Sequence, residues 1–179
     1  MTLDEAKVLL SENNIPFELC EFHNEAEYWC RTILFPDTKN AKACKVIAII
    51  IRSNNGKKNI ELQFNAVGDV FCFEELWFGD YAFEMFDYNE DMLADDLIRN
   101  ILEIKQGKLI IIVRNDIRKK RLLADACFDL SDEDNAFGEL GFQKALQRIK
   151  RPKELFSKLR RTKEQYEIYD WDSYQCIVK

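Results

Sequence analysis

The single histidine of the chain, His23, lies near two thiols that could act as nucleophiles. Cys20 precedes it, Cys30 follows it, and the carboxylate of Glu25 lies between them in sequence. A Cys–His pair can do nucleophilic chemistry because the imidazole takes the thiol proton. A turn histidine explains the same residues more simply, and one histidine excludes a multi-histidine metal site within one chain. We therefore expect no catalytic residue here.

A second candidate chemistry uses carboxylates that hold a divalent metal. Pro36-Asp37 is followed, after a predicted strand and hairpin, by Glu61-Leu62-Gln63. This spacing loosely resembles the PD-(D/E)xK nucleases, in which two carboxylates bind the metal and a lysine assists the water. Gln63 stands where the lysine belongs. The resemblance thus leaves a metal-dependent nuclease, using Asp37 and Glu61, as an alternative function.

Other motifs that bind metals or cofactors are missing from the sequence. The segment DLSDEDNAFGEL resembles a calcium loop, but Asp134 replaces the glycine at its sixth position and Leu140 replaces the glutamate at its twelfth. There is no Gly-x-Ser-x-Gly, P-loop, dinucleotide fingerprint or His-Glu-x-x-His. We expect neither a cofactor nor a metal.

One stretch mixes aromatic rings with carboxylates and holds no lysine or arginine. It reads EELWFGDYAFEMFDYNEDMLADD, from Glu74 to Asp96. Strand alternation accounts for its aromatic residues, but it does not explain why every charge has the same sign. Aromatic side chains anchor protein contacts and carboxylates steer a basic partner. The residues we expect to bind such a partner are Glu75, Trp77, Asp80, Tyr81, Glu84 and Asp87.

Positive charge is concentrated elsewhere in the chain. Asn59 to Ile98 holds eleven acids and no lysine or arginine, whereas Gly141 to Lys163 holds nine lysines and arginines and one acid, Glu154. The two segments could neutralise each other, be solvated, or bind separate partners. The net charge of −6 and the pI near 5.0 argue most strongly against nucleic acid as the partner of the basic segment.

Hydrophobic periodicity predicts an α+β fold with an antiparallel β-meander, a short N-terminal helix, one central helix and C-terminal helices. We expect one domain over 1–179, with a sheet-rich core at 1–130 and a helical part at 131–179. Leu122–Leu130 fits either a strand or a helix, and the tail WDSYQCIVK fits an edge strand. The predicted helices are Thr2–Leu10, Asn89–Lys105, Phe137–Lys150 and Lys153 to about Tyr169. The first of them begins with Thr2 and Glu5 at capping-box spacing. The predicted strands are Phe17–Phe22, Tyr28–Phe35, Lys45–Arg52, Asn59–Ala66, Val70–Leu76, Tyr81–Tyr88 and Leu109–Val113.

Glycines mark the turns of the predicted meander. They are Gly56 in an Asn-Gly turn, Gly68 and Gly79. In the strand Asn59–Ala66, we expect Ile60, Leu62 and Phe64 to share one face.

The cysteines and the first residues bear on the cellular compartment. Six cysteines occur without a Cys-x-x-Cys pair, and the opening MTLDEAKVLL is acidic and amphipathic, unlike a secretory signal. The longest fully apolar run, Val46 to Ile51, is too short to span a bilayer. We expect reduced thiols, a cytoplasmic location and no membrane association.

The layout resembles that of small immunity proteins that neutralise bacterial polymorphic or contact-dependent toxins. The resemblance covers most of the chain: a short helix, an antiparallel meander, then helices, with the acidic and aromatic ELWFGDYAFEMFDYNED between them. It implies one-to-one binding of a toxin domain, often a basic nuclease, by acidic and aromatic side chains. The other binding alternative is a structural or regulatory protein that contacts nucleic acid through its basic C-terminal helices. Its candidate residues are Arg148, Lys150, Arg151, Arg160 and Arg161.

Overall fold

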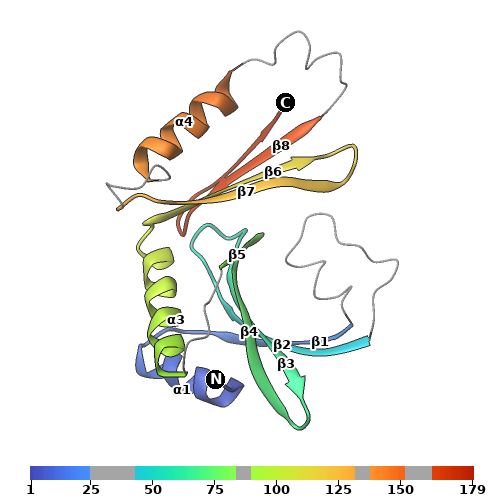
Figure 1. The fold of residues 1–179 in the computed structure, drawn as a ribbon, viewed down its shortest axis with the longest axis vertical. Coiled ribbons are helices and arrows are strands. Elements are labelled where there is room, and N and C mark those ends of the chain that lie inside the picture. Colours follow the sequence, from blue (N-terminus) through green and yellow to red (C-terminus); the bar gives the residue numbers. More distant parts are fainter. Residues whose placement is uncertain (25–42, 84–89, 132–137, 152–162) are drawn as a thin grey trace. The chain divides into compact units, whose positions relative to one another are not determined.

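The computed structural model describes residues 1–24, 43–83, 90–131, 138–151 and 163–179 (Figure 1). They form an α+β fold with two antiparallel sheets and, in the described ranges, three helices. The chain forms two compact units, Met1–Leu102 and Glu103–Lys179, which we call unit 1 and unit 2. The grouping of 1–179 into one domain stays a prediction. No helix in the described ranges is long and apolar enough to cross a membrane.

Unit 1 contains a five-stranded antiparallel sheet and two helices. The strands follow one another in the order β1-β2-β3-β4-β5, which confirms the predicted meander. Its elements are α1 (Leu3–Glu12), β1 (Glu18–Asn24), β2 (Ala43–Ile51), β3 (Ile60–Val67), β4 (Val70–Phe78), β5 (Tyr81–Phe83) and α3 (Glu90–Lys105), whose last three residues belong to unit 2. The predicted strand Tyr28–Phe35 and the end of the predicted strand Tyr81–Tyr88 lie outside the described residues.

Glycines at tight turns allow the meander to fold back on itself. Gly56, in the Asn-Gly turn between β2 and β3, has φ 66°, and Gly68, in the turn between β3 and β4, has φ 64°. These left-handed backbone angles cost glycine little because it has no Cβ. The turns thereby set the register in which β3 pairs with both β2 and β4.

The central strand β3 is buried on both of its faces. Ile60, Leu62 and Phe64, which we predicted to share one face, are fully buried. Glu61 and Gln63 point to the other face and are only 5% and 7% exposed. The second face of β3 therefore carries buried polar groups.

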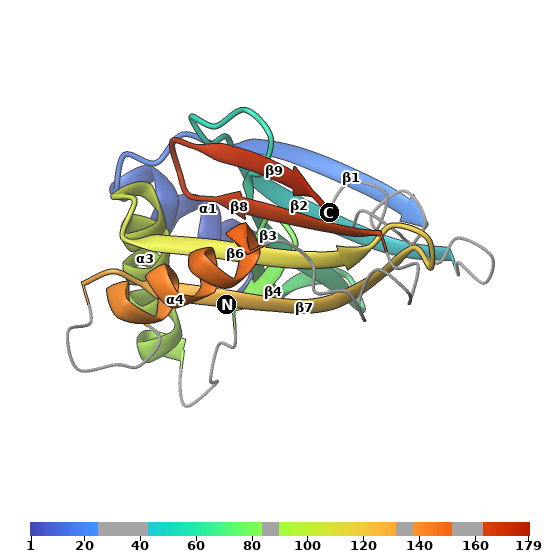
Figure 2. The ribbon, with the colours of Figure 1, turned by 90° about the horizontal axis from the view of Figure 1, so that it is seen from above.

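Unit 2 contains a four-stranded antiparallel sheet in the order β7-β6-β8-β9, seen side by side in Figure 2. Its elements are β6 (Leu109–Asp116), β7 (Arg121–Asp129), α4 (Glu139–Lys150), β8 (Glu164–Tyr169) and β9 (Tyr174–Val178). Ile149 of α4 packs against one face of the sheet with Ile110, Ile112, Phe128 and Ile168. The segment 122–130, which fitted either a strand or a helix, lies in β7 up to Asp129. The tail forms the predicted edge strand, β9.

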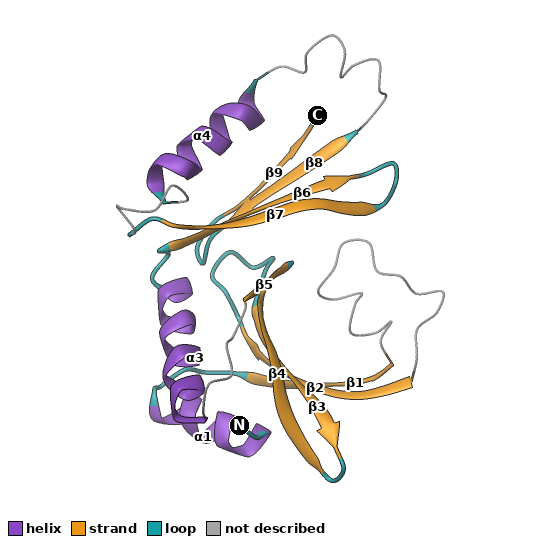
Figure 3. Cartoon of the chain, in the orientation of Figure 1, coloured by secondary structure: helices purple, strands orange, loops and turns teal. Residues whose placement is uncertain are grey.

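The helix predicted from Lys153 to about Tyr169 is wrong over its last third. Glu164–Tyr169 forms β8, which pairs with both β6 and β9 (Figure 3). In the sequence EQYEIY, apolar Tyr166 and Ile168 alternate with polar neighbours, and this two-residue period suits a strand. Of the two helices predicted in the C-terminal part, the first corresponds to α4. Residues 153–162 of the second lie outside the described residues.

Candidate functional site

Two of the predicted partner-binding residues lie side by side on β4. Glu75 and Trp77 point to the same face of the sheet because they are two residues apart in a strand. The indole Nε1–H of Trp77 donates a hydrogen bond of 2.8 Å to a carboxylate oxygen of Glu75. Their cross-strand neighbours on β3 are Gln63 and Glu61. The carboxylate of Glu75 thus fixes the orientation of the indole. Glu61, a residue of the nuclease alternative, lies directly beside Trp77.

Asp80 has a structural environment that differs from that of an exposed steering carboxylate. It lies in the turn between β4 and β5, and it is 9% exposed. The ammonium of Lys58 lies 2.6 Å from its Oδ2, and both side chains are largely buried. A buried carboxylate needs such a counter-charge to remain ionised. The charge of Asp80 is therefore already balanced within unit 1.

Tyr81 is separated from Trp77 by the alternation of the sheet. It opens β5 and pairs with Phe78, whereas Ala82 is the residue that pairs with Trp77. The ring of Tyr81 meets that of Phe83 edge-on, with centroids 5.1 Å apart. The structure thus brings Glu75 and Trp77 together and directs Tyr81 to the opposite face. Glu84 and Asp87 lie outside the described residues.

A polar cluster surrounds Glu74, which sits at a bulge in the pairing of β3 with β4. Its Oε2 accepts hydrogen bonds from the side-chain amides of Gln63, at 3.1 Å, and Asn65. Although the residue is exposed overall, partial desolvation of its carboxylate raises the pKa of Glu74, and the negative charge of Glu75 adds to this.

The cluster does not supply nuclease machinery within the described residues. Gln63, in the lysine position of the nuclease pattern, directs its amide nitrogen at Glu74. Glu61 is buried on β3, while Asp37 lies outside the described residues. The described ranges contain no group of three or more His, Cys, Asp or Glu side chains placed to hold a metal ion. Of the two carboxylates that the nuclease alternative needs, only Glu61 therefore lies in the described residues.

The proposed Cys–His pair is also placed only in part. His23 lies in β1, so the expectation of a turn histidine is wrong: the extended backbone continues to Asn24, which pairs with Ala43 of β2. Cys20 is a half-buried residue that packs on the cluster of Phe22 and its neighbours. Cys30 lies outside the described residues.

A groove that the sequence reasoning did not identify runs between α1 and α3. It has a volume of about 520 Å³ and is open to solvent. Its lining residues are Met1, Asp4, Glu5, Val8, Leu9, Glu12 and Ala94. Of these, Val8 is 57% exposed, although an aliphatic side chain of this size is usually buried. The signal in the sequence is the presence of Val8 and three acids on a helix whose opposite face carries Leu3, Ala6 and Leu10.

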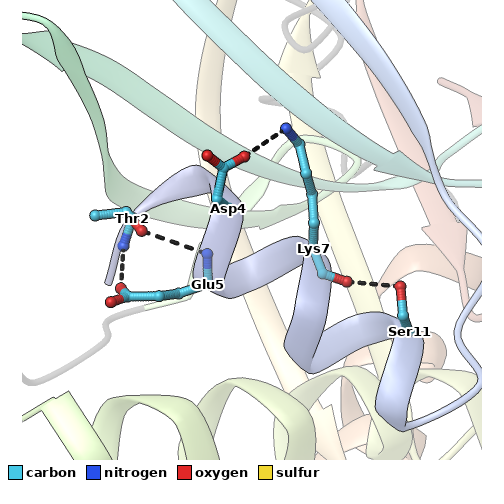
Figure 4. Close-up of polar contacts among 5 residues, drawn as sticks. All are labelled: Thr2, Asp4, Glu5, Lys7 and Ser11. Atoms are coloured by element: carbon cyan, nitrogen blue, oxygen red, sulfur yellow. Dashed lines mark hydrogen bonds and ion pairs between the residues drawn. The ribbon is translucent and has the colours of Figure 1, made fainter.

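Local hydrogen bonds hold the acidic end of this groove (Figure 4). Thr2 caps α1: its Oγ1 accepts from the Glu5 N–H at 3.3 Å, and its own N–H donates to the Glu5 carboxylate at 2.7 Å. This reciprocal capping box was predicted from the sequence. The bond from the Thr2 N–H is the main cause that lowers the pKa of Glu5, which keeps this carboxylate ionised. Asp4 forms an exposed ion pair with Lys7 at 2.8 Å.

The basic residues of the nucleic-acid alternative gather at the end of α4. Arg148 and Lys150 lie in its last turn, where the helix dipole favours positive charge, and Arg151 caps it. All three are exposed. Arg160 and Arg161 lie outside the described residues, as does half of the calcium-like segment.

The comparisons with known proteins do not extend this picture. No protein-family model matches the chain, and neither does any curated protein or solved structure. The candidate sites therefore rest on geometry and charge.

Proposed function

We propose that this protein is a non-catalytic binding module, an immunity-type inhibitor that acts in the cytoplasm on a basic partner such as a toxin domain. The observation that carries the proposal is the open groove between α1 and α3, in which apolar side chains lie among acids. Its lining combines Val8 and Leu9 with Asp4, Glu5 and Glu12. An apolar floor with charges of one sign around it is the arrangement that binds an oppositely charged amphipathic segment.

The charge of unit 1 supports the same partner chemistry. Residues 1–102 contain 19 acids and 9 lysines and arginines, which gives unit 1 a net charge of −10. Four of those basic residues, Lys7, Arg52, Lys58 and Arg99, are already paired with acids of unit 1. The surplus is therefore negative, and it would attract a basic protein and speed its association at low salt.

The groove also specifies the spacing that a partner helix needs. Asp4 and Glu12 lie eight residues apart on α1, which at the rise of an α-helix is roughly 12 Å. A partner helix with basic side chains seven or eight positions apart and apolar ones between them would match both ends. Covering the exposed side chain of Val8 would add the hydrophobic contribution, at about 25 cal/mol per Å² buried.

Of the six residues expected to bind the partner, Glu75 and Trp77 fit this proposal best, because they are adjacent and half-buried. Asp80 is occupied by Lys58 and Tyr81 points to the opposite face. Glu75 and Trp77 therefore form a second, smaller candidate contact, separate from the groove.

The first test uses a helical peptide of lysine and leucine, with lysines eight positions apart and leucines between them. Its binding to the full chain is measured by fluorescence anisotropy at low and moderate salt. Glu12→Lys reverses a groove charge, and Asp69→Lys makes the same charge change in the exposed turn after β3. We expect Glu12→Lys to weaken binding about tenfold, and Asp69→Lys to change it less than twofold. Equal losses in both variants would contradict the groove as the binding site.

A second test concerns the shape of the groove and the natural partner. Ala94→Phe fills the groove, whereas Leu102→Phe enlarges an exposed side chain on the same helix, outside the groove lining. The wild-type chain and the Ala94→Phe variant are each used to capture proteins from a lysate. The proteins that only the wild-type chain retains are purified and assayed for toxic or nuclease activity. The proposal requires that stoichiometric addition of the chain inhibits that activity. Retention that Ala94→Phe leaves intact, or activity that the chain leaves intact, would overturn it.

A further inference from the structure

Unit 2 contains a second cavity with the opposite electrostatic character. It has a volume of about 300 Å³ and lies where α4 meets the sheet. This volume is at the lower end of the range, about 300–1,000 Å³, that is typical of small-molecule sites. The apolar part of its lining comes from Ile112, Phe128 and Ile149, all of them nearly buried.

Small side chains leave the cavity open. Ala124 and Ala126 of β7 and Ala145 of α4 line it, and each ends at Cβ. Ala124 and Ala126 face the same side of the sheet as Arg114 and Ile112, because these residues are their cross-strand partners. The cavity thus has an apolar floor, bordered along one side by a guanidinium.

Arg114 is held in one orientation by its neighbours. Its Nε and Nη2 donate to the two carboxylate oxygens of Glu164 at 3.0 and 2.9 Å. The hydroxyl of Tyr166 also donates to Glu164, at 2.6 Å. The bidentate pair uses one edge of the guanidinium, so the N–H groups on Nη1 and the second one on Nη2 are not needed for it. Tyr166 is a second neighbour of this guanidinium, whose carbon lies 5.9 Å from the centroid of the tyrosine ring. A fixed guanidinium with N–H groups outside the Glu164 pair can bind a second anion.

A second guanidinium, that of Arg148, lines the same cavity from α4 and is exposed. Asp125 also contributes to the lining, but its strand position pairs with Val113, on the sheet face opposite to Arg114. The strand alternation therefore directs the Asp125 carboxylate away from the face that carries the cavity. Two arginines remain on that face, and Glu164 balances one of them.

We propose that this cavity binds a small molecule with an apolar body and an anionic carboxylate or phosphate group. The body would lie on Ile112, Phe128 and Ile149, and the anion would meet the N–H groups of Arg114 outside its pair with Glu164, together with the guanidinium of Arg148. Arginine suits this role because its planar donors match the two oxygens of either anion. The site is independent of the groove in unit 1, and its failure would not affect the function proposed above.

The test is isothermal titration calorimetry on the full chain with four probes. They are 2-naphthoate, 2-naphthyl phosphate, the uncharged 2-naphthamide and inorganic phosphate. We expect saturable binding of at least one of the two naphthyl anions, with 2-naphthamide and inorganic phosphate each at least tenfold weaker, because body and anion act together. The stronger naphthyl anion identifies the carboxylate or the phosphate as the natural headgroup.

Three variants assign that binding to the cavity. Arg148→Gln removes one anion contact, and we expect about tenfold weaker binding, the usual effect of losing a hydrogen bond to a charged group. Ala126→Phe fills the cavity and should abolish binding, with circular dichroism confirming the fold. Lys150→Gln removes a nearby exposed charge of α4 outside the lining and should change binding less than twofold.

Three results would overturn the proposal. The first is no saturable binding of either naphthyl anion. The second is binding that Arg148→Gln and Ala126→Phe leave unchanged. The third uses a single-stranded oligonucleotide that competes with the probe. If Lys150→Gln weakens binding of the oligonucleotide as much as Arg148→Gln does, the basic face of α4 binds polyanions without a defined cavity.

Discussion

The two units are built alike but present opposite charge. Each is an antiparallel sheet with helical segments, yet unit 1 has a net charge of −10, and unit 2, with 13 acids and 17 lysines and arginines, has +4. Each cavity also matches the unit that contains it, since three acids line the groove in unit 1 and two arginines line the cavity in unit 2. The difference shows that charge in this chain is partitioned by folding unit, and that the partition extends to the places where a ligand would bind.

This partition changes how the charge pattern of the sequence is interpreted. From the sequence, the acidic and the basic segment can be solvated, neutralise each other or bind separate partners. Within the described residues, some lysines and arginines of unit 1 pair with acids of the same unit, as in Arg52–Glu18 and Lys58–Asp80. In unit 2, Arg114 pairs with Glu164. Local pairs thus account for part of the charge, and each unit keeps a surplus of one sign.

The largest expected effect compares the cores of the two units. Phe64 in unit 1 is fully buried, with the ring of Phe73 5.7 Å away edge-on. Phe128 in unit 2 is 5% exposed and borders the cavity beneath α4. We expect Phe64→Ala to lower the free energy of unfolding by about 4 kcal/mol and Phe128→Ala by about 3 kcal/mol, since a ring beside a cavity loses fewer contacts.

Chemical denaturation with circular dichroism measures both values, and hydrogen exchange shows which strands lose protection. Val67→Ala is the control, because Val67 is 65% exposed on the same strand as Phe64 and should change stability by less than about 0.5 kcal/mol. A larger loss for Phe128→Ala than for Phe64→Ala would contradict the assignment of open space to the core of unit 2.

The next effect concerns the ion pair of Asp80 with Lys58. Their side chains are 8% and 15% exposed, so Asp80→Asn would leave a nearly buried ammonium without its counter-charge. We expect a loss of about 3 kcal/mol, the lower end of the range for breaking buried pairs. Glu18→Gln breaks the pair with Arg52, whose side chains are more than half exposed, and should cost less than about 1 kcal/mol.

Urea denaturation of both variants at neutral pH gives the two values. The same experiment tests the original expectation for Asp80. If Asp80→Asn weakened partner binding without destabilising unit 1, Asp80 would act as a steering charge and its pairing with Lys58 would be incidental.

Local sequence signals predicted much of unit 1. Alternating apolar residues, an Asn-Gly turn and two further glycine turns gave the meander, and Thr2 with Glu5 gave the capping box. These features depend on residues that are close together in the chain. The strand β8 was missed because a helical pattern upstream was extended through EQYEIY, whose two-residue period is short and easily overlooked.

The candidate sites were less predictable because they depend on residues far apart in sequence. The groove joins Val8 to Ala94, and the ion pair joins Lys58 to Asp80. The cavity in unit 2 combines Arg114 and Tyr166 from the sheet with Arg148 from α4. No local pattern specifies such contacts, since they follow from the order and register of the strands. The acidic and aromatic composition around Trp77 indicated a charge sign but not which side chains share a face.

A smaller effect is expected at the cap of α1, beside the acidic groove. Thr2→Ala removes the oxygen that accepts the Glu5 N–H, and we expect a loss of about 1 kcal/mol in thermal or urea denaturation. Ser11→Ala, which removes an exposed hydroxyl at the other end of the helix, should cost less than about 0.5 kcal/mol.

The acid dependence of stability separates the two halves of this capping box. The folded state lowers the pKa of Glu5 from 4.5, so its contribution is present above that pH and is lost as pH falls through the folded pKa. Glu5→Gln should remove this part of the acid dependence. Thr2→Ala keeps the main-chain donor, which is the larger cause, and should retain most of it, since the Thr2 side chain is the smaller cause. Identical pH profiles for Glu5→Gln and the wild type would contradict the assigned hydrogen bond.

The smallest effect is an alkaline one in unit 2, at the Tyr166 hydroxyl beside Arg114. Burial, reinforced by the hydrogen bond to Glu164, raises the pKa of Tyr166 from 10 to about 12. Because the folded state holds this proton more tightly than the unfolded chain, its contribution to stability is complete below pH 10 and declines towards pH 12. In the ultraviolet titration of the folded protein, Tyr166 should contribute to a late phase. Tyr166→Phe should reduce that phase by the absorbance of one tyrosine, and Glu164→Gln should move the contribution of Tyr166 to lower pH without returning it to 10, since burial remains. A late phase of unchanged amplitude in Tyr166→Phe would contradict the raised pKa of Tyr166, and the network that orients Arg114 would lose its support.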